Sequence, residues 1–345
     1  MKRVLLPERA NWQQAHQEIG FDYYNLLSRD GSMYWSEGVA YEFSLKQIEQ
    51  LEDASNELHQ MCLEVAGDMI QRGHYPEYFQ IPPAAIPLIE HSWKNQAPML
   101  YGRFDFAYDG QATKMLEYNA DTPTGLLEAS VAQWHWIEQV ENIANRDQFN
   151  SIHEKLIERW KQLYPARSRV HFAACQEAGR EDWGNLEYLM DTAFQAGLNV
   201  SELSMENIGW NGTAFVDLHQ REIQHLFKLY PWEWIWEENF SQFLTPETEW
   251  IEPCWKMLLS NKALLIELWK RFPNHPLLLE THAYDAHAHY AGKWVRKPIL
   301  AREGANIHIL QNNVDCGAAS GSFYFDDYDK YGYVMQRWVK TPLHE

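Results

Sequence analysis

Residues 101–130 read YGRFDFAYDGQATKMLEYNADTPTGLLEAS and carry two short polar patterns on either side of a turn. Arg103 and Asp105 alternate in the first pattern, and side chains two apart on a strand point to the same face. Glu117 and Asn119 alternate in the second, and the Asp-Gly pair at 109–110 is typical of a turn between paired strands. We therefore expect a hairpin with one cation, two carboxylates and an amide on one side, a set suited to Mg²⁺ and phosphate.

Two interpretations of this hairpin stay open. Charged residues that alternate with apolar ones usually form the solvated face of an antiparallel strand. A binding site is favoured by the residues that follow, because Asp121-Thr122-Pro123 is typical of a helix start, with Asp121 or Thr122 as N-cap and Pro123 at the first helical position. A helix N-terminus beside the acidic cluster would offer N–H groups to an anion.

Length and composition limit the class of protein. The chain has 345 residues, enough for about two domains, and 46% of them are hydrophobic, which is ample for a core. A formal net charge of −19 argues against nucleic acid and anionic membranes as main partners. No apolar run of about 20 residues predicts a membrane span. The cysteines are far apart and without a CxxC pair, so we expect free thiols and a cytoplasmic location; they are Cys62, Cys175, Cys254 and Cys316.

The hydrophobic pattern predicts mixed helices and strands. The clearest helix spans 44–72, with a Ser44–Gln47 capping box and Gly73 as its stop. Further helices are expected at 123–141, 147–163 and 253–271. A βαβ unit is expected from a strand at 169–174, a helix at 181–196 and a strand at 198–205. Other strands are expected at 215–218, 223–229, 293–300, 306–310, 321–326 and 332–340.

A second polar group lies in the last third of the chain. Lys297 sits within a predicted strand that runs into a loop with Arg302 and Gly304, and a glycine there permits close approach of backbone to a phosphate. Lys262 lies near a predicted helix start, where an exposed surface lysine is the ordinary interpretation. Neither GxxxxGK[ST] nor GxGxxG occurs, which disfavours P-loop and Rossmann nucleotide sites.

From Arg9 to the C-terminus the chain resembles the glutathionylspermidine synthase family, and most of all its stand-alone bacterial members named as acid–amine ligases. Six blocks carry the resemblance: YGRFDFAYDG, LEYNADTPTGLLEAS, DQFNSIHEKL, FKLYPWEW, WIEPCWKMLLSNKALL and VRKPILAREGANI. It implies an α+β, ATP-grasp fold preceded by a βαβ, pre-ATP-grasp-like unit. The expected division is 1–165 with the metal and phosphate hairpin, 166–254 with the βαβ substrate region, and 255–345 as the nucleotide-binding part. Family members continue beyond the position of Glu345, so this part is expected to be incomplete at its C-terminus.

The resemblance also implies roles for single residues. Asp105, Glu117 and Asn119 stand where the family has its Mg²⁺ ligands, and Arg103 where an arginine holds the transferred phosphate. Lys262 and Lys297 stand at ATP-contacting lysines, Arg302 lies in the loop that closes over the site, and Gln336 lies on the strand of the adenine-side hinge. Lys228, Trp232 and Glu233 resemble a block that lines the acid or amine pocket; a packed aromatic turn with one buried Lys–Glu pair is an equal alternative.

The implied reaction is amide formation from a carboxylate, such as glutathione or another peptide, and an amine, such as a polyamine, with ATP and Mg²⁺ as cofactors. Positioning and charge neutralisation would carry it, without a covalent nucleophile. Two rivals stay open: a non-catalytic nucleotide- or peptide-binding paralogue, and a metal-dependent hydrolase that uses the same carboxylates. His282, His287 and His289 are expected in a surface loop and not in a metal site.

Overall fold

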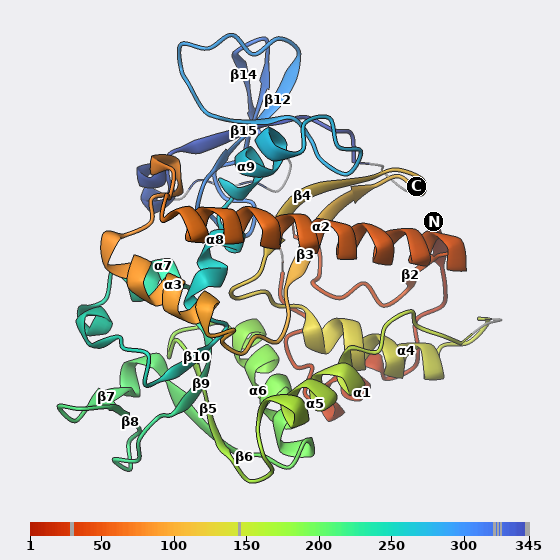
Figure 1. Ribbon diagram of the computed structural model, residues 1–345. Coiled ribbons are helices and arrows are strands. Elements are labelled where there is room, and N and C mark those ends of the chain that lie inside the picture. Colours follow the sequence, from red (N-terminus) through yellow and green to blue (C-terminus); the bar gives the residue numbers. More distant parts are fainter. Residues whose placement is uncertain (28–30, 144–145, 320–321, 323, 325, 342–345) are drawn as a thin grey trace.

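A computed structural model describes residues 1–27, 31–143, 146–319, 322, 324 and 326–341, which form a mixed α+β fold (Figure 1). Two larger sheets lie at opposite ends of the molecule in Figure 1, and the helix α2 and the hairpin β3–β4 lie between them. No helix among the described residues is long and apolar enough to cross a membrane.

Helix α2 (Leu45–Arg72) confirms the clearest sequence prediction. The Ser44 hydroxyl accepts from the Gln47 N–H, the Gln47 side chain returns the bond, and Gly73 ends the helix in the left-handed region. Its buried face includes Leu58, Cys62, Val65 and Met69. These side chains join a core cluster that also contains Leu203, Trp232 and Val334, so one core is shared by segments far apart in the chain.

The first sheet is parallel and has the order β10-β9-β5-β6. Its strands are β5 (Arg169–Ala174), β6 (Asn199–Ser204), β9 (His225–Leu229) and β10 (Glu249–Ile251), and α6 (Arg180–Gln195) connects β5 to β6. The predicted βαβ unit is therefore confirmed. Helix α5 (Ile152–Leu163) packs against α6 on this side of the molecule.

The second sheet is antiparallel and has the order β11-β15-β12-β13-β14. Its strands are β11 (Thr281–Ala283), β12 (Lys293–Pro298), β13 (His308–Gln311), β14 (Val314–Ala318) and β15 (Tyr333–Arg337). The loop between β12 and β13 holds Arg302 and Gly304. The 3-10 helix η7 (Asp326–Tyr331) precedes β15.

The predicted hairpin is confirmed as β3 (Arg103–Tyr108) and β4 (Thr113–Asn119). Arg103 pairs with Asn119 and Asp105 with Glu117, and a bulge leaves Leu116 as an extra residue in β4. The Asp109 carboxylate accepts from the N–H groups of residues 111 and 112 and closes the turn. The hairpin contacts the second sheet's side of the fold through the Met115 N–H, which donates to the Leu277 carbonyl.

The remaining elements are short. They are β1 (Lys2–Leu5), α1 (Trp12–Glu18), β2 (Val39–Glu42), η1 (Glu77–Phe79), η2 (Pro83–Ala85), α3 (Ile86–Lys94), the π-helical turn η3 (Glu128–Ala132), α4 (Gln133–Gln139), η4 (Met205–Asn207), β7 (Gly209–Trp210), β8 (Phe215–Val216), α7 (Trp232–Ile235), η5 (Asn239–Phe243), η6 (Cys254–Lys256), α8 (Met257–Ser260) and α9 (Leu264–Arg271).

Several predicted boundaries are wrong. The helix expected from 123 begins only at Leu126, because Gly125 is in the left-handed region and the Asn185 side chain of α6 caps the N–H groups of 125 and 126. The helix expected at 253–271 is broken into η6, α8 and α9. The strand expected at 321–326 falls partly outside the described residues, and Ser322 and Tyr324 are not in a strand. Strand β14 was not predicted.

Candidate active site

The polar face of the hairpin brings four predicted residues together. The Arg103 Nε lies 2.9 Å from the Asp105 Oδ1. The Asn119 amide Nδ2 lies 3.4 Å from the Asp105 Oδ2 and 3.2 Å from the Glu117 Oε1. The arrangement is a row of cation, carboxylate, amide and carboxylate, as the alternation predicted. The side chains of the row become more buried from Arg103 (46% exposed) through Asp105 (35%) to Glu117 (23%), so the solvated-face interpretation fails at Glu117.

Two lysines from distant segments close one side of this row. The Lys262 Nζ lies 3.2 Å from the Glu117 Oε2 and donates to the Ala301 carbonyl at 2.8 Å. The Lys297 Nζ donates to the carbonyl of the bulge residue Leu116 at 3.1 Å and to the Gln336 Oε1 at 2.6 Å. Both lysines are buried, so the surface interpretation of Lys262 is wrong. The early hairpin and the late sheet therefore meet at Glu117.

The electrostatics of the row follow from burial and these partners. Burial would raise the pKa of Glu117, but Lys262 and Lys297 outweigh it and lower the pKa to about 2. Burial lowers the pKa of Lys297 to about 8, against the opposing attraction of Glu117. Burial also raises the pKa of Asp105, and repulsion from Glu117 adds to this against the attraction of Arg103. Two like charges held this close favour a bound cation between them.

Two arginines contact the segment that leaves β4. The Arg103 Nη1 donates to the Thr124 carbonyl at 3.2 Å, and the Arg302 guanidinium donates to the Thr122 hydroxyl. Arg302 also lies 5.2 Å from the centre of the Trp234 ring. Gly304 lies in the same loop as Arg302, exposed and with a φ of 72°. The segment between β4 and α4 thus accepts hydrogen bonds from two guanidinium groups, one at a backbone carbonyl and one at a side-chain hydroxyl.

An acidic face lies next to Arg302, and of its residues the sequence analysis named only Glu233. Asp182 and Glu233 are both half-buried, and Arg302 acts on the pKa of each. Burial raises the pKa of Asp182 to about 6. Arg302 lowers this pKa in part, and repulsion from Glu181 and Glu303 raises it further. The Thr124 hydroxyl donates to Glu181 at 2.9 Å, which ties this face to the segment beside Arg103.

Lys228 and Trp232 are both fully buried, and Trp232 borders a small pocket beside Ser92 and Trp250, away from the hairpin row. The Lys228 Nζ lies 2.5 Å from the Asp121 Oδ1, and the Trp232 N–H donates to the Asp121 Oδ2 at 2.9 Å. Asp121 is therefore a buried ion-pair partner and not a helix N-cap, and the buried lysine pairs with an aspartate instead of a glutamate. Of the three residues predicted there, only Glu233 keeps exposed surface.

A second buried pair holds the other strand at the same open end of the hairpin. Glu252 accepts from the N–H groups of Leu100 and Tyr101 at 3.0 and 3.1 Å, and the Lys256 Nζ lies 2.5 Å from the Glu252 Oε2. Lys256 also donates to the Tyr101 carbonyl. The chain is thus fixed just before Arg103 by Glu252 and Lys256, and just after Asn119 by Lys228 and Asp121.

The cluster is closed in this structure. The gap bordered by Glu117, Asn119 and Lys262 has an empty volume of about 210 Å³ and no room for a water molecule. The described residues contain no group of three or more His, Cys, Asp or Glu side chains placed to hold a metal by themselves. His282, His287 and His289 are exposed, as predicted, but only His287 and His289 lie in a loop, because His282 is part of β11.

The fold resembles that of a glutathione synthetase-like effector from Globodera pallida, with a TM-score of 0.55 and 10% identity over 98% of this chain and 84% of that one. At this identity the likeness concerns the fold alone. Fold and site together define an α+β protein with carboxylates and lysines gathered on a central hairpin.

The sequence comparisons give the family. Residues 3–345 match the family model described as glutathionylspermidine synthase preATP-grasp, and the chain belongs to this family. It is 51% identical over 350 residues to a Haemophilus influenzae protein named "Putative acid--amine ligase", covering 99% of this chain and 89% of that protein. The resemblance described from the sequence is therefore confirmed.

More distant relatives are longer. The chain is 26% identical over 354 residues to trypanothione synthetase of Crithidia fasciculata, covering 91% of this chain and 52% of that protein. It is 26% identical over 315 residues to the bifunctional glutathionylspermidine synthetase/amidase of Escherichia coli K12, covering 82% and 50%. The chain spans about half the length of these two relatives. Its relatives are named as ligases and synthetases, which supports an acid–amine ligase.

Proposed function

We propose that this chain carries the site of an ATP- and Mg²⁺-dependent ligase that joins a carboxylate to an amine through an acyl phosphate. The observation that carries the proposal is the meeting of Glu117 with Lys262 and Lys297 across about 145 and 180 residues of chain. A solvated hairpin face would not require two buried lysines from other segments. The family relationship supports the same class of reaction.

The residues fit a Mg²⁺ ion. Mg²⁺ is usually held by one or two carboxylates, and waters and substrate phosphates fill the other positions. Asp105 and Glu117 would supply the carboxylates and Asn119 an amide oxygen. The raised pKa of Asp105, caused by burial and by repulsion from Glu117, is relieved by a cation at this position. When bound, the ion would neutralise charge on the phosphates during transfer.

The residues also fit the phosphates of a nucleotide, because the positive groups outnumber the carboxylates within the hairpin row, where Arg103, Lys262 and Lys297 face Asp105 and Glu117. Arg302 lies in the adjoining loop and donates to Thr122. Since the gap at Glu117 is closed, nucleotide entry requires the second sheet to move away from the hairpin. This movement breaks the Lys297 bond to the Leu116 carbonyl and the bond that the Gln336 Nε2 donates to the Met115 carbonyl at 3.2 Å.

The chemistry follows from the placement of these groups. A carboxylate oxygen of the acid attacks the terminal phosphorus of ATP, an acyl phosphate forms and ADP leaves; the amine then attacks the acyl carbon and phosphate leaves. Arg103, at the open end of the row, would stabilise the negative oxygens of the transferred group. Lys262 and Lys297 would hold the remaining phosphates, and Arg302 with Gly304 would cover them.

The acidic face beside Arg302 suits the amine. Asp182, Glu181 and Glu233 would attract a cationic ammonium group, and the attacking amine must lose a proton. The pKa of Asp182, raised to about 6, places it near the range in which a carboxylate accepts a proton at neutral pH. The printed names of two relatives, which include glutathionylspermidine, make glutathione and a polyamine the first substrates to examine.

The test is a turnover assay that reads ADP and phosphate release with MgATP and pairs of candidate acids and amines, glutathione with spermidine first. We expect release that requires both substrates and is lost in Asp105→Asn, while Glu49→Gln, an exposed change on α2, leaves it intact. Saturable MgATP binding without turnover in any pair would favour the non-catalytic rival. Amide hydrolysis without ATP would favour the hydrolase.

A further inference from the structure

The end of β4 is held by a single side-chain hydroxyl from another segment. The Ser260 Oγ, on the last residue of α8, accepts from the Ala120 N–H at 2.9 Å and from the Asp121 N–H at 2.7 Å. These two N–H groups follow Asn119 directly, and both residues that carry them are buried. A buried N–H group that loses its acceptor costs free energy, so the Ser260 hydroxyl fixes the place where β4 ends.

The same segment returns to β4 two residues further on and closes a ring. The Lys262 Nζ lies 3.2 Å from the Glu117 Oε2. One side of the ring runs along β4 from Glu117 to Ala120, and the other runs from Ser260 to Lys262 in the linker between α8 and α9. Asn119 lies within this ring. Because both sides are short, the separation of Glu117 and Lys262 depends on the contact that Ser260 makes.

The linker between α8 and α9 is also fixed to two other segments. The Asn261 Nδ2 donates to the Phe79 carbonyl of η1 at 2.8 Å. The Lys262 N–H donates to the carbonyl of Ile299, the residue after β12, at 3.1 Å. The linker therefore joins η1, the second sheet and the hairpin, and Ser260 provides its contact with the backbone of the hairpin.

We propose that Ser260 is a positioning residue of the candidate active site. Its hydroxyl holds the end of β4 so that Glu117 and Asn119 stand in a fixed relation to Lys262, and it acts through these residues without contact with the nucleotide. This inference rests on the proposed function in so far as it concerns MgATP. Groups that orient the ligands of a metal typically contribute about 10–100-fold to metal affinity or activity.

The first test is isothermal titration calorimetry of the full chain with MgATP. Ser260→Ala removes the acceptor of both N–H groups, and the Kd for MgATP should become about 10–100-fold weaker. Ser260→Thr keeps a hydroxyl oxygen at this partly exposed position and should restore most of the affinity. A role in packing alone would not be restored by the hydroxyl.

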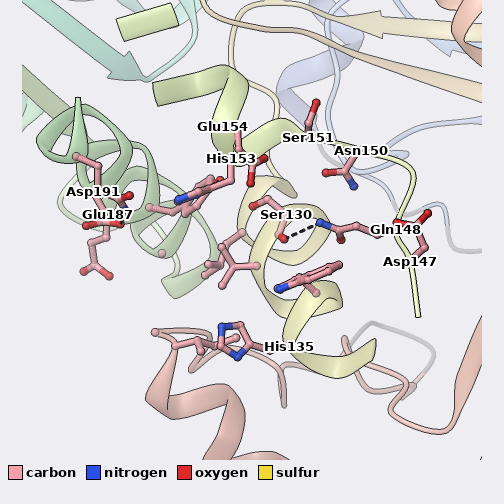
Figure 2. Close-up of a pocket in the computed structure, with 18 residues that line it drawn as sticks. Ser130, His135, Asp147, Gln148, Asn150, Ser151, His153, Glu154, Glu187 and Asp191 are labelled. Atoms are coloured by element: carbon pink, nitrogen blue, oxygen red, sulfur yellow. Dashed lines mark hydrogen bonds between the residues drawn. The ribbon is translucent and has the colours of Figure 1, made fainter. Parts of the chain in front are cut away.

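Two buried serines elsewhere provide matched controls. The Ser92 Oγ accepts from the Trp255 N–H at 3.2 Å, which is the same kind of contact as that of Ser260. Ser130 lies in η3, its hydroxyl donates to the Leu126 carbonyl, and it borders a separate cavity of about 770 Å³ (Figure 2). None of the described residues that line this cavity belongs to the candidate active site. Ser92→Ala and Ser130→Ala should destabilise the fold and leave the Kd for MgATP unchanged.

The second test is urea unfolding without metal or nucleotide, which examines the ring itself. If the two contacts support each other, Ser260→Ala should cost less in a Lys262→Met background than in the parent chain. The unfolding equilibrium constant of the double variant should then differ by about fivefold or more from the product of the two single effects. Ser130→Ala and Lys262→Met should combine independently.

Independent effects of Ser260→Ala and Lys262→Met would overturn the proposal. Equal MgATP affinity of Ser260→Ala and Ser92→Ala would also overturn it, as would a loss of affinity that Ser260→Thr does not restore. A parent chain that binds no MgATP would refute the proposed function instead, and the unfolding measurements would still decide whether Ser260 positions Lys262. If Ser260→Ala does not fold, Ser260→Cys provides the same tests, because a thiol is a weak acceptor.

Discussion

Replacing Lys297 with methionine separates stability from nucleotide binding. Methionine keeps most of the aliphatic side chain and removes the ammonium group. Burial lowers the pKa of Lys297 from 10.5 to about 8, and at about 1.4 kcal/mol per pKa unit the charged form costs about 3 kcal/mol in this place. The substitution removes that cost, but it leaves the Leu116 carbonyl and the Gln336 Oε1 without their donor, at about 1–3 kcal/mol each.

These contributions nearly cancel, so the free energy of unfolding of Lys297→Met should stay within about 3 kcal/mol of the parent value. The affinity for MgATP, in contrast, should fall. A charge-assisted hydrogen bond to phosphate is worth about 1.5–3 kcal/mol, which corresponds to about a 10–150-fold weaker Kd for MgATP.

Urea unfolding measures the free energy of unfolding, and isothermal titration calorimetry measures the Kd for MgATP. Lys46→Met, on the exposed side of α2, is the matched control. A folded Lys297→Met protein with parental MgATP affinity would refute the assignment of Lys297. A loss of stability well above 3 kcal/mol would show that its role is structural.

Four further predictions concern the same region. Asp105→Asn and Glu117→Gln should each abolish MgATP-dependent turnover, while circular dichroism shows a retained fold, because each removes a proposed Mg²⁺ ligand; unchanged rates in both would contradict the metal assignment. MgATP affinity should fall as pH rises through about 8, since Lys297 loses its proton there, and Lys297→Arg should keep the affinity at pH 9 if the charge alone matters. The free energy of unfolding of the unliganded protein should instead rise with pH. The folded protein binds the Lys297 proton less tightly than the unfolded chain, so the charged lysine destabilises the fold below pH 8, and this cost is relieved between about pH 8 and 10.5. Lys228→Met should lower the free energy of unfolding by about 3–5 kcal/mol in urea, because it leaves Asp121 buried and unpaired, whereas Lys228→Met/Asp121→Leu should recover much of that loss; an equal loss in both would argue that packing and not the unpaired charge is responsible.

The sequence predicted those parts of the fold in which local and tertiary preferences agree. The Ser44–Gln47 capping box and Gly73 fix both ends of α2 by local chemistry alone. The hairpin was predictable because its polar residues alternate and its turn is an Asp-Gly pair. The bulge at Leu116 was not, although it frees the carbonyl to which Lys297 donates.

The errors occur where a distant side chain replaces a local signal. Asp121 and Thr122 have the composition of an N-cap, but Asn185 caps the helix instead and Asp121 pairs with Lys228 in the core. The break between α8 and α9 follows from Asn261, whose side chain accepts from the Ala263 N–H and starts a new helix. Strand β14 has the sequence VDCGA, with a glycine and little strand preference, and it forms by pairing with β13.

The candidate site divides in the same way. Residue types and spacing indicated the hairpin row and Lys297, and the family resemblance indicated Lys262. Asp182 and the Glu252–Lys256 pair carried no signal, because a carboxylate in a helix or a lysine four residues after a glutamate is ordinary on a protein surface. Only the fold shows that Asp182 is half-buried near Arg302 and that Lys256 is enclosed.

Hydrogen–deuterium exchange with and without MgATP tests most directly whether the hairpin and the second sheet form one nucleotide site. The segments to follow are 119–124, between β4 and α4, and 301–306, between β12 and β13, because Arg103 and Arg302 reach the first and Lys262 reaches the second. We predict that MgATP slows exchange in both segments with the same concentration dependence, and that Asp105→Asn removes both effects. Protection of one segment without the other, or of neither at saturating MgATP, would contradict the account.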